Sequence, residues 1–255
     1  MRWIKPRKSA AILSLGILAA MPATALHAEP IVIKYEGPNS QNYKPGKKLM
    51  SNAKISLKSG EILTVLDERG TRTLRGPGTF SATSSANAGN VSNTSLAALI
   101  KTNSVRRART GAVRGESGVQ QTAVNPNLWF VDISKGGKLC VADFQNLQLW
   151  RANTSESQQI SASESTTGNS ATVKFSKGRT TASWPSNISP KDGGRYNLSV
   201  PGKAEKIALE LVSVDVTGQE RLDTLASKLL DRGCQVQSEL LAATFAQADP
   251  LPTKG

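Results

Sequence analysis

Short runs of alternating apolar and polar residues, separated by glycine turns, constrain the fold of this chain most strongly. In the segment 54–80 each run is too short for a stable helix, and Gly60 and Gly70 stand between consecutive runs. Alternation puts the apolar side chains on one face of an extended strand, and glycine permits the tight turns that join neighbouring strands. The sequence therefore predicts a small β module over residues 29–83.

The same pattern returns in the last half of the chain. Trp129, Val131 and Ile133 alternate with other residues, and Gly136-Gly137 then provides a turn signal. In the run 207–216 the apolar phase shifts by one residue, which is typical of a β-bulge. We predict a C-terminal β-sandwich-like domain over residues 123–250.

A helical hairpin is expected at the end of this domain. Thr217 and Glu220 have the spacing of a capping box, and leucines then recur at helical intervals. Gly233 suits the left-handed position that ends a helix. A second helix is predicted from about residue 235 to 246, so the chain as a whole reads as mainly β with two terminal helices.

The residues between the two β regions, 84–122, have too little apolar surface to offset the entropy of ordering them. We interpret them as a flexible linker, in which Ser95 to Lys101 could make two helical turns. The alternative is a docking segment for an anionic partner, because basic residues gather there with no acid among them. The candidate anion-binding residues are Arg106, Arg107, Arg109 and Arg114.

The N-terminal residues 1–28 have the layout of an export signal. Four basic residues precede an uncharged apolar run from Ser9 to Ala20, which is shorter than a membrane span requires. Cleavage is predicted after Ala28, with Ala25 as the other candidate and an uncleaved anchor as the alternative. No later segment is apolar enough to cross a membrane, so we expect a secreted or otherwise exported protein.

The chain has 32 Lys and Arg against 19 Asp and Glu, a formal net charge of +13, or +9 without the leader. A basic excess can indicate nucleic acid, but export argues against that partner. An envelope protein or an anionic envelope polymer fits the expected compartment better. The alternative is that the charge only keeps the surface soluble.

The only histidine, His27, lies in the predicted leader. Without it the processed chain has no imidazole for a Ser-His-Asp or Cys-His mechanism and no histidine metal ligand. No other motif indicates catalysis or a phosphate loop. We therefore name no catalytic, cofactor-binding or metal-ligating residue, expect no cofactor, and predict a protein that is not an enzyme.

Two cysteines remain, Cys140 and Cys234. In an oxidising compartment a small, even number of cysteines favours a disulfide, which here would fasten the helical hairpin to the sheet. A free, reactive thiol is the competing interpretation.

Aromatic residues of the C-terminal region offer one candidate ligand-stacking surface. Trp184 and Tyr196 are its candidate residues, since Trp184 precedes Pro185 and proline favours sheet edges and turns. Core packing is the alternative for both, because each aromatic side chain buries a large apolar area.

The segment Tyr43–Phe80, with turns at Pro45-Gly46, Ser59-Gly60, Gly70 and Gly76-Pro77-Gly78, resembles the FecR-type domain of bacterial envelope proteins. The resemblance implies an all-β periplasmic module, found in proteins that relay a signal from the outer membrane to a regulator. It supports our leading hypothesis, a non-catalytic exported envelope protein that binds or scaffolds a partner in a sensory system. The alternative hypothesis is a carbohydrate- or peptidoglycan-binding module that uses the C-terminal aromatics.

Overall fold

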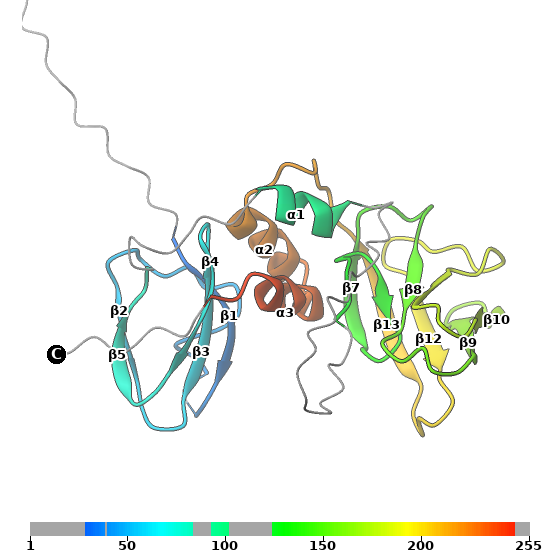
Figure 1. Ribbon diagram of the computed structural model, residues 1–255, viewed down its shortest axis with the longest axis horizontal. Coiled ribbons are helices and arrows are strands. Elements are labelled where there is room, and N and C mark those ends of the chain that lie inside the picture. Colours follow the sequence, from blue (N-terminus) through cyan, green and yellow to red (C-terminus); the bar gives the residue numbers. More distant parts are fainter. Residues whose placement is uncertain (1–28, 39, 84–92, 102–123, 248–255) are drawn as a thin grey trace, which may run out of the picture.

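The computed structural model describes residues 29–38, 40–83, 93–101 and 124–247. Figure 1 shows a β module formed by the N-terminal residues at one end, helices in the middle and a second group of sheets at the other end. The prediction of a mainly β chain with a C-terminal helical pair is confirmed. None of the described helices is long and apolar enough to cross a membrane.

The N-terminal module contains two small antiparallel sheets. Strands β1 (Ile31–Glu36), β3 (Ile62–Asp67) and β4 (Gly70–Arg75) form one sheet in the order β1-β3-β4, and β2 (Lys54–Leu57) pairs with β5 (Gly78–Ser81). Both sheets contribute apolar side chains to one core, as the alternating pattern requires. These side chains include Val32, Leu63, Val65, Ile55 and Phe80.

The C-terminal region contains a five-stranded sheet in the order β10-β9-β12-β13-β7 and a three-stranded sheet in the order β11-β8-β6. The pairs β13-β7 and β6-β8 are parallel, and the other pairs are antiparallel. Side chains from the two sheets share one core. The strands are β6 (Val131–Asp132), β7 (Gly137–Val141), β8 (Gln148–Trp150), β9 (Gln158–Glu164), β10 (Ser170–Phe175), β11 (Thr181–Ser183), β12 (Arg195–Ser199) and β13 (Ile207–Ser213).

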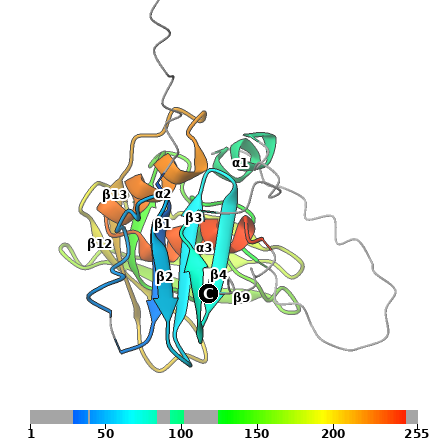
Figure 2. The ribbon, with the colours of Figure 1, turned by 90° about the vertical axis from the view of Figure 1, so that its left-hand side faces the viewer.

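Three helices form a layer between the two groups of sheets (Figures 1 and 2). They are α1 (Asn93–Ile100), α2 (Leu222–Asp231) and α3 (Gln235–Thr244). Helix α2 contacts β1 and β3, whereas α3 contacts β1 and β4 on one side and β7 on the other. The helical hairpin is therefore packed against both halves of the molecule.

The helical layer explains the shift of apolar phase in the run 207–216, which we had interpreted as a β-bulge. In β13, Leu209 and Leu211 enter the core between the C-terminal sheets, whereas Val214, just after the strand, packs against the helices. The register between β13 and β7 is uninterrupted from Leu209 to Ser213. The predicted bulge in the run 207–216 is thus wrong: the phase changes because the chain buries residues first on one face and then on the other.

Helix α2 begins later than its capping-box pattern suggested. Its first residue is Leu222, and its N-cap is Arg221, whose side chain makes no capping hydrogen bond. Thr217 and Glu220 do bond to each other, but they do so within the turn that precedes the helix. The predicted stop at Gly233 is confirmed, since Gly233 has a φ of 79° and its N–H donates to the Leu230 carbonyl over 2.9 Å.

Part of the predicted linker is ordered structure. Residues 93–101 contain helix α1, whose Leu96, Leu99 and Ile100 are buried against the helical layer. The end of this helix is fixed from the C-terminal half, because the indole Nε1 of Trp129 donates to the Ile100 carbonyl over 2.6 Å. The two helical turns considered for Ser95 to Lys101 are therefore present, and residues 93–101 are packed structure rather than flexible linker. Residues 84–92 and 102–122 lie outside the described residues.

The last described residues return to the N-terminal module. The N–H of Thr71, at the start of the β4 edge strand, donates to the Phe245 carbonyl over 2.8 Å, and the N–H of Gln247 donates to the Thr71 carbonyl over 2.8 Å. A parallel bridge joins Thr71 to Ala246. Residues 245–247 thus cover part of a sheet edge that would otherwise present unpaired backbone groups.

Candidate functional site

The candidate site is a cavity of about 480 Å³ between α3 and the C-terminal sheets. We call it the junction cavity. Val236 and Leu240 of α3 form one wall, and Phe130, Leu139 and Trp150 line it from the strand side. A cavity of this size with a mostly apolar lining matches the typical small-molecule site of a globular protein.

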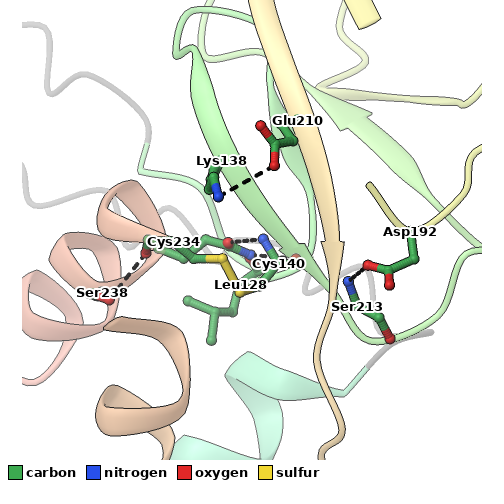
Figure 3. Close-up of a disulfide and its surroundings, with 9 residues drawn as sticks. Leu128, Lys138, Cys140, Asp192, Glu210, Ser213, Cys234 and Ser238 are labelled. Carbon is green, nitrogen blue, oxygen red and sulfur yellow. Dashed lines mark hydrogen bonds and ion pairs between the residues drawn. A yellow bond between two sulfur atoms is a disulfide. The ribbon is translucent and has the colours of Figure 1, made fainter. Parts of the chain in front are cut away.

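A disulfide fixes the wall that α3 forms. Cys140 of β7 and Cys234, the residue before α3, are joined by an S–S bond of 2.01 Å, with their Cα atoms 5.7 Å apart (Figure 3). The predicted pairing is confirmed, and neither cysteine is free. The crosslink holds the first turn of α3 against the strand that forms the opposite wall.

Gln237 strengthens the same junction through hydrogen bonds. Its side chain is 2% exposed, and its Nε2 donates to the carbonyls of Leu128 and Cys140, each over 2.8 Å. Its Oε1 accepts the N–H of Cys140 over 2.6 Å. The sequence pattern did not indicate a role for Gln237, because a single glutamine on a predicted helix is normally a surface residue.

The charged side chains around the junction cavity balance one another. Asp132, Lys135, Lys138 and Glu239 contribute two positive and two negative formal charges. Lys138 Nζ lies 3.3 Å from Glu210 Oε1, and Asp132 Oδ1 accepts the N–H and the hydroxyl of Ser134 over 2.8 and 2.6 Å. The site has no net charge of its own that would select an anion or a cation.

The aromatic pair that we considered for ligand stacking is not available for it. Trp184 is 8% exposed and Tyr196 is 1% exposed, and their rings meet edge to face with centroids 5.1 Å apart in the C-terminal core. Trp184 Nε1 donates to the Ile188 carbonyl over 2.7 Å, and the Tyr196 hydroxyl donates to the Ser189 carbonyl over 3.0 Å. Burial raises the pKa of Tyr196. The core interpretation therefore replaces the stacking interpretation for both residues.

The predicted anion-binding site is not part of the described structure. Arg106, Arg107, Arg109 and Arg114 all fall outside the described residues. Within the described part of the chain, no three histidine, cysteine or acidic side chains are grouped so that they could hold a metal ion.

Comparison with known proteins adds no relative. No family model, no curated protein and no solved structure matches this chain. The junction cavity must therefore be interpreted from its own chemistry.

Proposed function

We propose that this chain is a non-catalytic binding protein of the bacterial cell envelope that holds its ligand in the junction cavity. Its N-terminal module is FecR-like, and its place is the periplasm or the exterior, reached through the leader at residues 1–28. In a sensory system, the binding of ligand at the junction would change how the chain interacts with a partner protein of the envelope.

The junction cavity is the observation that carries this proposal. It is lined by both the helical hairpin and the C-terminal sheets, and the hairpin also packs on the N-terminal module through Ile33 and Leu66. A ligand that stabilises the hairpin would therefore act on both halves of the molecule at once. A ligand that binds one arrangement of the hairpin more tightly than another would shift the molecule towards that arrangement.

Two further features support a location in the periplasm or outside the cell. A disulfide between Cys140 and Cys234 is expected of proteins in oxidising compartments and is rare in the cytosol. The resemblance of Tyr43–Phe80 to the FecR-type domain, together with the five short strands within 31–81, is compatible with a periplasmic module. The carbohydrate-binding alternative loses its support, since Trp184 and Tyr196 are buried.

Native mass spectrometry of the full-length protein purified from envelope fractions tests the proposal. We expect the wild-type chain to retain a bound molecule of the envelope. Val236→Trp, which fills the cavity from α3, should retain none. The control Thr244→Trp lies on the same helix but is exposed and does not line the cavity, so it should retain the molecule.

Two results would contradict the proposal. One is an unliganded wild-type protein that recovers no molecule when it is incubated with solubilised envelope. The other is turnover of an envelope compound that disappears when a single acidic side chain, such as Asp132 at the cavity, is replaced by its amide.

A further inference from the structure

The three tryptophans that the structure describes are all buried, but they differ in what their indole N–H groups bond to. Trp129 donates to the Ile100 carbonyl and Trp184 to the Ile188 carbonyl. Trp150 is 3% exposed, and its N–H meets no acceptor among the described residues. Buried indole N–H groups usually have a partner, so this difference needs an explanation.

The junction cavity provides the explanation. Among the described residues, Thr71 Oγ1 is the only buried side-chain nitrogen or oxygen that is closed to solvent and lacks a partner. The Trp150 N–H is therefore still reached by solvent, although nearly all of the side chain is covered. Trp150 is also one of the residues that line the junction cavity, so an acceptor bound there would lie beside the one described tryptophan whose N–H has no partner.

The rest of the lining defines what kind of acceptor fits. Phe130, Leu139 and Leu240 present apolar surface, and the formal charges around the cavity cancel. Placing an ionised group against this apolar wall would cost it much of its hydration. A neutral acceptor such as a carbonyl oxygen would instead satisfy the Trp150 N–H at a smaller cost in hydration.

One residue of the cavity lining, Val124, is apolar and exposed to solvent. Val124 lines the cavity and is 67% exposed, and in the described chain it is one of two large apolar side chains left in water, the other being Met50. Isolated apolar residues on a surface are ordinary, but one at the edge of an apolar cavity extends the surface that a ligand can cover.

We propose that the junction cavity binds an uncharged, mainly apolar small molecule whose carbonyl-type oxygen accepts a hydrogen bond from the indole N–H of Trp150. This inference rests on the proposed function and adds the chemical class of the ligand and the residue that orients it. Trp150 is a binding residue here, and the apolar side chains of α3 and the strands supply the remaining contact.

Three naphthalene probes that differ at one substituent test this class: 2-acetylnaphthalene, which carries a carbonyl, 2-ethylnaphthalene, which does not, and 2-naphthoate, which is charged. Their affinities for the full chain are measured by displacement of Nile red fluorescence. We expect the ketone to bind on the order of five-fold more tightly than the ethyl compound, the ratio that one neutral hydrogen bond supplies. The carboxylate should bind most weakly.

Trp150→Phe keeps an apolar ring but removes the N–H. It should bind 2-ethylnaphthalene as the wild type does and lose the preference for the ketone. This internal comparison separates loss of the hydrogen bond from loss of the fold. Val236→Trp should exclude all three probes, while Thr244→Trp should behave as the wild type.

Equal affinity for the ketone and the ethyl compound, or a preference that survives in Trp150→Phe, would overturn the assignment of the donor. Tightest binding of 2-naphthoate would overturn the assignment of an uncharged ligand. An envelope molecule retained by the wild type and lost in Val236→Trp would leave the proposed function standing in either case. Conversely, the probe preferences without any retained envelope molecule would support the cavity chemistry and contradict the proposed function.

Discussion

At the scale of single residues, Thr71 is in an unusual position. Its backbone N–H and carbonyl are both bonded to residues 245–247, but its hydroxyl is closed to solvent and has no partner among the described residues. A buried hydroxyl without a hydrogen bond lowers the stability of the fold by the cost of removing it from water. Thr71 is also one of the residues that line a smaller cavity, of about 200 Å³, between the sheet β1-β3-β4 and α3.

Thr71→Val should therefore raise the free energy of unfolding by about 1 kcal/mol, since valine has nearly the same shape and suits a strand. Urea denaturation measures the change. Thr73→Val, on the same strand and only half-buried, is the control and should change stability little. A loss of stability in Thr71→Val would mean that the hydroxyl has a partner, such as a water molecule in the smaller cavity.

Single residues also show which parts of the candidate site could be predicted from the sequence. Cys140 and Cys234 were predictable as a pair, because a small, even number of cysteines favours a disulfide over a free thiol if the chain is exported. Gln237 and Trp150 were not predictable as junction residues, because their roles depend on which elements pack together. Trp184 misled us because the proline after it indicated an edge, whereas the side chain points into the core.

At the scale of elements, the strands and the helical pair were predictable from local patterns, but the elements they pack against were not. Alternation identifies a strand with one buried face, and a continuous apolar run is typical of a strand buried on both, but neither pattern says what covers each face. In β7, Leu139 and Val141 pack in the sheet core while Cys140 packs with the helices. The second covering layer lies far away in sequence, so no local pattern predicted that one helical hairpin would serve both halves.

The turn before α2 gives an element-scale prediction on pH. Burial opposes ionisation of Glu220, but hydrogen bonds from the backbone N–H groups of Thr217 and of Glu220 itself, and from Lys228, outweigh it and lower the pKa of Glu220. The folded state then binds protons less readily than the unfolded state, so protonation favours unfolding. The stability that Glu220 contributes is present above the ordinary glutamate pKa, near 4.3, and is lost as the pH falls through its folded value.

We therefore expect Glu220→Gln to be less stable than the wild type at neutral pH, with the difference shrinking as the solution is made acidic. Urea midpoints measured across the acidic range check this. Glu205→Gln, at an exposed position, should keep the wild-type pH dependence. Identical pH slopes for Glu220→Gln and the wild type would show that this carboxylate does not contribute.

At the scale of the whole molecule, the helical layer joins the two β regions into one packed unit. Leu229 of α2 is fully buried in a cluster that also contains Leu66 of β3 and Val214 beside β13. A residue shared in this way should make the stabilities of the two regions depend on each other. In a chain of separate β domains connected by a flexible segment, each domain would instead unfold with its own stability.

Leu229→Ala should cost about 2–5 kcal/mol, the usual range for removing a buried leucine side chain, and should lower amide exchange protection in β3 and in β13 together. Hydrogen exchange measures both strands in one experiment. Asp231→Ala, exposed on the same helix, is the control and should leave protection unchanged in both. Reduced protection in β13 with unchanged protection in β3 would show that the two regions unfold independently.

The bond between Cys140 and Cys234 also closes a covalent ring through the molecule. The ring contains β8 to β13 and α2, which is most of the C-terminal sheet structure. A protease that cuts once between residues 142 and 233 would therefore release no fragment until a reductant opened the ring. Nicked protein would keep its full mass on a non-reducing gel, so damage in this region stays hidden unless the sample is reduced.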